Sequence, residues 1–315
     1  MVETPGDSGS INGPRQISLT LGGPAAGLLL LLYTLLYVLP LYASKRTRPS
    51  PTLSRDSPLV IQARITSVTV STALCSVLTF LILSARSDDG SDSGSISPLR
   101  AMGYWPLGLW HSLRSLALVA LLFAGPLYEA LVVYGMWKDW TTLQPLYDIW
   151  YEWTSWRNFV VGPVTEELLF RSAAVPLLVG AGVSLGKIVF LTPIIFGLAH
   201  IHHFYEFRLT HPHVPIIAAV ARSLLQLTYT TLFGAYATFI FLRTGSLLAI
   251  IIVHAFCNAM GLPRFWGHVQ PYWMYPGQQP WVWTSVYYVL LVSGSVAWWW
   301  QLWPLTESGN ALASW

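Results

Sequence analysis

Residues 24–43 read PAAGLLLLLYTLLYVLPLYA, an apolar run of the length that crosses a bilayer as one helix. Three further stretches, 65–85, 223–242 and 244–263, contain no Lys, Arg, Asp or Glu. Of the 315 residues, 54% are hydrophobic and 10% are charged, whereas an ordinary soluble domain carries about 25% charged residues. The mean hydropathy of +0.52 agrees with this bias. The sequence therefore predicts a polytopic membrane protein.

Eight segments are expected to span the membrane as helices. They are residues 24–43, 65–84, 113–135, 159–180, 187–203, 215–243, 245–262 and 281–303. The bilayer core offers no water to backbone N–H and C=O groups, and the alternating pattern of a barrel strand is missing, so these segments must be helical. We expect an all-α fold of about eight transmembrane helices around an intramembrane catalytic cavity.

Polar segments outside these helices indicate the domain organisation. Residues 1–22 are rich in Gly, Ser and Pro and are expected to form a disordered tail. Residues 23–303 are expected to form a single transmembrane helical domain, with a polar loop at 87–100. Residues 304–315 remain as a C-terminal tail.

The charges in the first two connections predict the orientation of the chain. The first connection is basic and contains Lys45, Arg46, Arg48, Arg55 and Arg64. The second is acidic and contains Asp88, Asp89 and Asp92. Basic connections stay on the cytoplasmic side of a membrane. With eight spans, the loops at 136–158, 204–214 and 264–280 are expected on that side too.

Several polar residues lie inside or at the ends of the apolar helices. They are Glu166, Glu167, His200, His254 and Asn258. The expected helix directions bring all five to one depth near the cytoplasmic side. An acidic group within the membrane costs about 2.5–3.5 kcal/mol on insertion scales, and helix packing rarely needs so many polar groups. Their co-occurrence predicts a catalytic centre inside the membrane.

Spacing predicts the geometry around the two glutamates. Glu167 and Arg171 are four residues apart, so they share a helical face and are expected to form an ion pair. Glu166 is turned about 100° away by the helical period, which leaves it free. Pro163 follows Gly162 and is expected to open or kink the helix. A helix N-terminus at this point would favour a carboxylate at Glu166.

Three motifs occur in a fixed order along the chain. They are GPxxEExxxR at 162–171, FxxxH at 196–200 and HxxxN at 254–258, together with the run AHIHH at 199–203. In order and spacing, over residues 110–265, they resemble the type II CAAX prenyl endopeptidases, and in particular the Ras-converting enzymes. These belong to the abortive-infection family of glutamic intramembrane proteases.

The resemblance implies removal of the C-terminal aaX tripeptide from prenylated C-a-a-X proteins, after the lipid has been attached to the cysteine. It implies that Glu166 and His200 activate a water molecule, and that His254 and Asn258 form the oxyanion site. Chemistry makes this division reasonable, because peptide hydrolysis needs both an activated water and donors aimed at the developing oxyanion. A carboxylate and an imidazole suit the first task, and amide and imidazole N–H groups suit the second.

Further expectations follow from the same resemblance. Glu167 and Arg171 would support the geometry of the site, and Phe196 would pack beneath His200. The enzyme would need no metal and no other cofactor. Its partners would be prenylated proteins such as Ras-like GTPases and the membrane lipid. Separately, the net charge of +3 and the juxtamembrane placement of the basic residues give no sign of a nucleic-acid partner. It would reside in the endoplasmic reticulum membrane with its active site open toward the cytosol.

Two other interpretations remain open. In a metal-dependent membrane hydrolase, the glutamates and His200, His202 and His203 could bind zinc or iron. Against this, the sequence contains neither HExxH nor the Glu-x-x-His pairs of di-iron bundles. In a non-enzymatic protein, the same residues could form a proton relay or belong to a scaffold. The chain shows no internal repeat of the kind that transporters often carry.

Overall fold

The computed structural model describes residues 17, 19–50, 53–87, 96–275, 278 and 280–315. Every regular element in these ranges is a helix, and the sole β feature there is an isolated bridge between Ser50 and Leu53. The expected all-α fold is confirmed. The disordered tail expected at 1–22 and the polar loop expected at 87–100 lie largely outside the described residues.

The helices follow one another along the chain in three parts. The first part of the chain forms α1 (Gly23–Val38), α2 (Pro40–Ala43), α3 (Pro58–Ser87), α4 (Pro98–Ala101), α5 (Leu109–Leu122), α6 (Ala124–Tyr128), the π-helical turn η1 (Glu129–Val133), α7 (Trp137–Thr141) and α8 (Gln144–Tyr151). The middle part forms α9 (Trp153–Trp156), the π-helical turn η2 (Arg157–Val161), α10 (Gly162–Glu167), the π-helical turn η3 (Leu168–Ala173) and α11 (Ala174–Gly180). The last part forms α12 (Leu185–Phe190), α13 (Thr192–Leu198), the 3₁₀ turn η4 (Ala199–Ile201), α14 (His202–Thr210), α15 (Ile216–Thr244), α16 (Leu247–Met260) and α17 (Trp281–Thr306).

Five helical stretches of the described chain are long and apolar enough to cross a membrane. They are Gly23–Ala43, Pro58–Ala85, Leu185–Thr210, Ile216–Thr244 and Trp281–Thr306. A sixth is added if α5 and the helix Ala124–Val133 count as one bent span. The expected number of eight is therefore not confirmed. The two remaining segments are helical, but α16 has only 14 residues, and the stretch from α9 to α11 carries too many charges.

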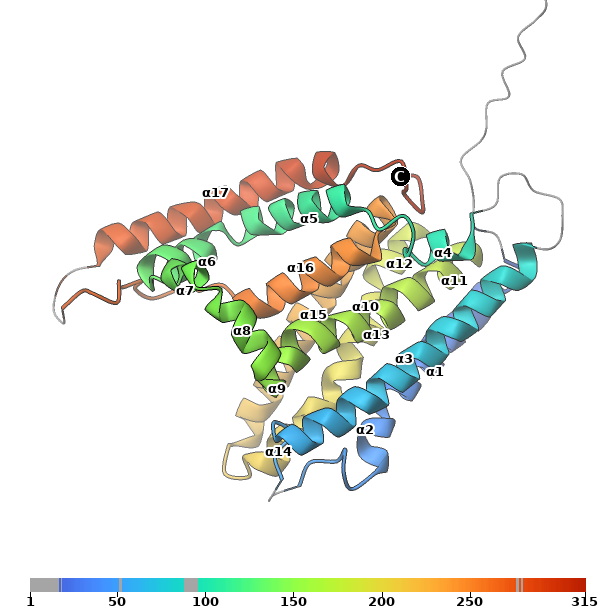
Figure 1. Cartoon of the computed structure of the whole chain (residues 1–315), viewed down its shortest axis with the longest axis horizontal. Coiled ribbons are helices and arrows are strands. Elements are labelled where there is room, and N and C mark those ends of the chain that lie inside the picture. The colour runs from blue at the N-terminus through green and yellow to red at the C-terminus, as the bar shows by residue number, and fades with distance from the viewer. Residues whose placement is uncertain (1–16, 18, 51–52, 88–95, 276–277, 279) are drawn as a thin grey trace, which may run out of the picture.

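The helices form two outer groups around a central one (Figure 1). On one side α1 and α3 lie against each other, and on the other α5 and α6 lie along α17. The central group contains α10, α13, α15 and α16, with α13 packed on α15 and α10 packed on α16. These central helices, with the turns η3 and η4 that continue α10 and α13, carry the residues of the three motifs.

A sharp bend of 84° separates α5 from the helix that follows it. Pro126 lies just after the bend, and a proline cannot donate a backbone hydrogen bond to the preceding turn. Both arms pack closely on α17 through glycines. A Cβ at Gly125 would lie 3.0 Å from the carbonyl oxygen of Tyr287, and one at Gly294 would fall on the carbonyl oxygen of Leu121. Small residues at such contacts allow membrane helices to approach closely.

The helix that carries the glutamates is not opened at Pro163. It runs without a break from Trp153 to Gly180, and the π-helical turn η2 directly precedes Gly162 and Pro163. A widened turn accommodates the proline ring, which would clash with the carbonyl of residue i−4 in a regular α-helix. The expected helix N-terminus near Glu166 was therefore wrong, because this helix begins at Trp153, well before the glutamate.

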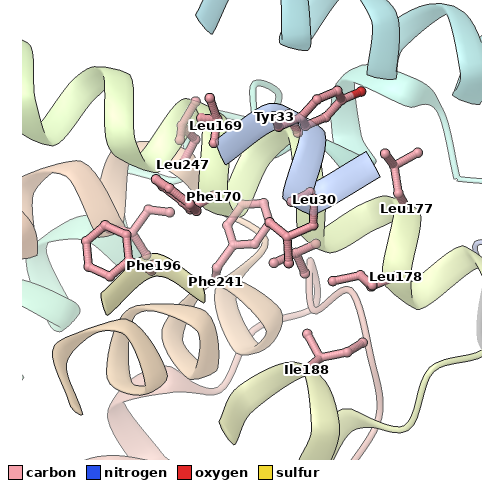
Figure 2. Close-up of a cluster of buried hydrophobic side chains, with 14 of the residues drawn as sticks. Leu30, Tyr33, Leu169, Phe170, Leu177, Leu178, Ile188, Phe196, Phe241 and Leu247 are labelled. Atoms are coloured by element: carbon pink, nitrogen blue, oxygen red, sulfur yellow. The ribbon is translucent and has the colours of Figure 1, made fainter. Parts of the chain in front are cut away.

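The main apolar core lies beside the central helices. Figure 2 shows Leu30 and Tyr33 of α1 near Phe170 of η3 and Phe241 of α15. Phe196 of α13 belongs to the same cluster. Its ring lies 4.9 Å, centre to centre, from the rings of both Phe170 and His200. The core thus extends directly to the polar residues of the motifs.

The C-terminal tail also contributes to this core. α17 ends at Thr306, and the chain returns to α15, where the backbone N–H of Leu312 donates to the carbonyl oxygen of Leu242 at 2.8 Å. The side chain of Leu312 is buried in the main apolar cluster. The tail expected at 304–315 is therefore docked on the domain.

Candidate active site

A cavity of about 950 Å³ opens among the central helices and α3. Glu166, Phe196, His200, His254 and Asn258 all line it, so the structure brings together the polar residues of the three motifs. They come from α10, α13, η4 and α16, which are distant in sequence. The rest of the lining is mainly apolar and aromatic, as expected for a cavity that accepts an amphipathic ligand.

Glu167 and Arg171 form the ion pair that their spacing predicts. Arg171 Nη1 donates to Glu167 Oε1 at 2.9 Å, and the two side chains are 1% and 0% exposed. Arg171 Nη2 also donates to the carbonyl oxygen of Gly234 at 3.3 Å. The guanidinium carbon lies 4.5 Å from the centre of the Phe196 ring. The pair therefore lies behind the cavity wall and fixes α10 against α13 and α15.

His254 makes a second contact with the same carboxylate. Its Nδ1 lies 2.6 Å from Glu167 Oε1, and because a carboxylate oxygen only accepts, Nδ1–H is the donor. The opposite ring nitrogen, Nε2, lies 3.8 Å from Glu166 Oε2. His254 thus lies between the two glutamates, with Nδ1 on the buried one and Nε2 on the one at the cavity.

His200 is oriented by its own helix. Its Nδ1 lies 2.8 Å from the carbonyl oxygen of Phe196, four residues earlier, so Nδ1–H donates there. In the neutral ring this leaves a lone pair on Nε2, which can accept a proton. The ring packs edge to face on Phe196 at 4.9 Å, as the resemblance implies.

Asn258 is held at the cavity by a helix that lies far away in sequence. Its Nδ2 donates to the carbonyl oxygen of Asn158 at 2.9 Å. A side-chain amide has two N–H groups, so this contact leaves one of them for a ligand. Asn258 lies one turn after His254 on α16, and both side chains line the cavity.

Glu166 presents its carboxylate to the cavity, with 19% of its side chain exposed. Among the motif residues, His254 is its neighbour, with Nε2 at 3.8 Å from Glu166 Oε2. His200 lines the same cavity from η4. Its ring contacts the ring of Phe196, which also packs near the ring of His254. Glu166 and both histidines therefore line the same cavity.

Several charged residues at or beside the cavity lie outside the three motifs. Arg55 and Arg64 were interpreted only as orientation signals, and Arg157 and Glu206 were given no role, yet the three arginines line the cavity. A signal existed for two of them. Arg64 and Glu206 each lie within a stretch apolar enough to span a membrane, where a charge needs a partner.

The metal interpretation can be compared with the donors present. His202, His203 and Glu206 place one ligand atom each within 4.8 Å of one another. However, the oxygens of Glu206 already accept from Tyr42, Arg64, Arg55 and His203 (Nδ1 at 2.9 Å). Two guanidinium groups beside this carboxylate disfavour a cation. This cluster is a network of ion pairs and does not suit a metal ion.

The fold and the site together define a class: a multi-pass α-helical membrane protein with carboxylate, imidazole and amide groups around an internal cavity. Residues 148–260 match the family described as type II CAAX prenyl endopeptidase Rce1-like. The chain is 38% identical over 278 residues to the probable CAAX prenyl protease 2 of Schizosaccharomyces pombe. The aligned region covers 88% of this chain and 92% of that protein.

Other relatives agree. The chain is 36% identical over 239 residues to human CAAX prenyl protease 2, which covers 72% of this chain and 68% of the human protein. It is 52% identical to CAAX prenyl protease 2 of Arabidopsis thaliana over 108 residues, 34% of each chain. No solved structure matches the chain. The chain belongs to the CAAX prenyl protease 2 family, which confirms the resemblance seen in the motifs.

Proposed function

We propose that this protein is an intramembrane endopeptidase that removes the aaX tripeptide from prenylated C-a-a-X proteins. One observation carries the proposal: Glu166 of α10, His200 of η4, and His254 and Asn258 of α16 line a single cavity within a member of the CAAX prenyl protease 2 family. The mainly apolar lining of that cavity suits a prenyl chain, and its polar wall suits a peptide bond.

In the proposed reaction, Glu166 and His200 activate one water molecule. The water oxygen attacks the carbonyl carbon of the prenylated cysteine, and its proton passes to the acceptor on the enzyme. Nε2 of His200 can accept because Nδ1 donates to the Phe196 carbonyl. The proton is then delivered to the leaving nitrogen, the C–N bond breaks, and the tripeptide leaves as a free amine.

The oxyanion of the tetrahedral intermediate would be held by an N–H of Asn258 and by Nε2–H of His254 in its imidazolium form, since Nδ1–H of His254 already donates to Glu167. Asn258 keeps one N–H after its bond to Asn158. One such donor contributes about 2.7–4 kcal/mol to lowering the barrier. Glu167 and Arg171 would fix the ring of His254, since Glu167 accepts from its Nδ1. No step of this reaction requires a metal ion or another cofactor.

A second assignment of the histidines is favoured by one distance. Nε2 of His254 lies 3.8 Å from Glu166, and the carboxylate of Glu167 orients its other nitrogen. This is the arrangement in which a carboxylate aligns an imidazole for proton transfer. In that case His254 would be the proton acceptor beside Glu166, and His200 would bind or orient the substrate.

The setting of the reaction is part of the same proposal. We assign the protein to the endoplasmic reticulum membrane, with the cavity open toward the cytosol and Ras-like GTPases among its substrates. The basic connection before α3 supports this orientation, because it contributes Arg55 to the cavity wall.

The direct test is mass spectrometry of a farnesylated C-a-a-X peptide incubated with purified protein. Wild type should release the tripeptide, and Glu166→Gln should lower the rate by about 10²–10⁴-fold, the usual contribution of a general base. The chelator EDTA should leave the wild-type rate unchanged. Near-normal cleavage by Glu166→Gln would reject its role, and proton flux in liposomes without any cleavage would favour the proton-relay alternative.

A further inference from the structure

A chain of alternating charges lies at the cavity, made of Arg157, Asp56, Arg55, Glu206 and Arg64, here called the arginine row. Arg157 Nη1 donates to Asp56 Oδ1 at 2.7 Å, and Arg55 Nε lies 3.8 Å from the same oxygen. Arg55 Nη1 then lies 2.9 Å from Glu206 Oε2, and Arg64 Nη2 lies 2.5 Å from Glu206 Oε1. The row joins the connection before α3 to α14 and to η2.

The charges of the row do not balance. It contains three guanidinium groups and two carboxylates, and all three arginines line the cavity. Other polar groups in contact with the row are neutral or weakly basic: the Tyr42 hydroxyl, the Asn158 amide, the Thr47 carbonyl and the rings of His202 and His203. One positive charge therefore lacks a partner within the row. A single carboxylate from a ligand would complete the alternation.

The end of the row at Arg157 is the more available one. Arg64 is largely buried and donates to Glu206 and to the carbonyl oxygen of Thr47. Arg157 uses Nε for Asn158 and Nη1 for Asp56, so two of its five N–H groups are engaged in these contacts. Its partner Asp56 is 54% exposed, so water can solvate that carboxylate if Arg157 turns toward a ligand.

The row lies within reach of the proposed catalytic groups. The ring centres of His200 and His203 are 5.8 Å apart, and Nδ1 of His203 lies 2.7 Å from Arg55 Nη1. Arg157 is also adjacent in sequence to Asn158, whose carbonyl oxygen holds Asn258. Three extended residues span about 10 Å. A tripeptide that begins at the scissile bond can therefore reach these arginines with its C-terminal end.

We propose that the arginine row binds the C-terminal carboxylate of the substrate, through Arg157 and Arg55. This inference rests on the proposed endopeptidase function and adds the group that fixes the position of the cut. Binding would place the carboxylate three residues beyond the scissile bond. Arginine suits this role, because its planar fork matches a carboxylate and it stays charged. The enzyme would thereby select a free chain end over an internal sequence.

The test compares two farnesylated peptides of one sequence, one ending in a free carboxylate and one in a carboxamide. Wild type should show a KM about tenfold or more lower for the acid peptide. Arg157→Gln should bring the ratio of the two KM values to near unity, because the substitution should weaken binding of the acid peptide more than binding of the amide peptide. Arg48→Gln is the matched control: Arg48 carries the same charge on the same connection as Arg55 but does not line the cavity, so it should keep the wild-type ratio.

A second variant should act in the opposite direction. Asp56→Asn removes the exposed carboxylate that pairs with both Arg157 and Arg55 and would compete with the substrate carboxylate. The variant should therefore lower the KM for the acid peptide severalfold and increase the preference for that peptide. A purely structural role of the row would not produce such a gain. Equal KM values for both peptides with wild type, or a parallel rise for both with Arg157→Gln, would overturn the inference. Cleavage of neither peptide by wild type would instead reject the proposed function, and the inference with it.

Discussion

His254 Nδ1 lies 2.6 Å from Glu167 Oε1, and this contact joins α16 to α10 at the cavity wall. The same oxygen accepts from Arg171 at 2.9 Å. The second oxygen of Glu167, Oε2, is buried and receives no hydrogen bond from the described part of the chain. One fully buried carboxylate therefore fixes an imidazole and a guanidinium at once. Its charge is compensated by Arg171, and its direction sets which nitrogen of His254 faces Glu166.

Glu167→Gln is expected to lower both activity and stability. The variant keeps an acceptor for His254 but loses the charge, and a hydrogen bond to a charged group contributes about 1.5–3 kcal/mol, so kcat should fall by about 10- to 100-fold. Arg171 would also be left buried without its counter-ion, which typically costs about 3–5 kcal/mol. The Tm in detergent should fall accordingly.

The double variant Glu167→Gln with Arg171→Met separates these two effects. It removes both charges, so the Tm should recover much of the loss while kcat stays low. Recovery of kcat together with the Tm would show that the pair acts only through stability. An unchanged Tm in the single variant would contradict the buried ion pair itself.

The sequence predicts the local part of this site and misses the part that depends on tertiary packing. The spacing of Glu167 and Arg171 on one helix predicts their ion pair, and the resemblance of the motifs implies the packing of Phe196 beneath His200. The contact between Glu167 and His254 spans 87 positions and depends on how α16 packs against α10. No periodicity within either segment contains that information.

The same limit explains the membrane spans. Apolar length predicts the long helices α1, α3, α15 and α17. For most of their termini, the predicted end lies within a few residues of the observed one. It cannot tell whether the segment at 113–135 crosses once or turns back, because the 84° bend depends on local breaks and on packing against α17. The arginines before and within α3 were interpreted as an orientation signal, since their partner Glu206 lies more than 100 positions away.

Asn258→Ala should affect the chemical step more than substrate binding. If its free N–H stabilises the oxyanion, kcat should fall by about 10²–10³-fold with little change in KM. Steady-state kinetics with a farnesylated peptide measure both. Cys257→Ala is a suitable control, because Cys257 also lines the cavity one position earlier but has no part in the proposed reaction. A raised KM with normal kcat for Asn258→Ala would assign it to substrate binding.

A second ion pair, between Arg264 and Glu129, should contribute to stability independently of pH near neutrality. Arg264 Nε and Nη2 lie 3.0 and 2.8 Å from Glu129 Oε1, which ties the loop after α16 to η1. The hydrogen bond to Glu129 raises the pKa of Arg264 above its usual range. A raised folded-state pKa contributes stability that is fully present below the unfolded-state value, so the arginine stays charged throughout the neutral range.

Arg264→Gln should therefore lower the Tm by about 1–3 °C, as for a partly exposed pair, and by the same amount at pH 6 and pH 9. Differential scanning fluorimetry of wild type and variant at both pH values measures this. The exposed Arg48→Gln variant should leave the Tm unchanged. A difference between wild type and Arg264→Gln that vanishes at pH 9 would contradict the assignment.

The two histidines can be distinguished by glutamine substitution. The amide nitrogen of Gln can occupy the position of a histidine Nε2 and donate a hydrogen bond, but it cannot accept a proton from water. If His254 is an oxyanion donor, His254→Gln should retain at least tenfold more activity than His254→Ala. If His200 is the proton acceptor, His200→Gln and His200→Ala should be equally inactive. Single-turnover cleavage of a farnesylated peptide measures all four variants. The opposite pattern, with activity retained by His200→Gln and lost in both His254 variants, would assign proton transfer to His254, the imidazole that lies 3.8 Å from Glu166.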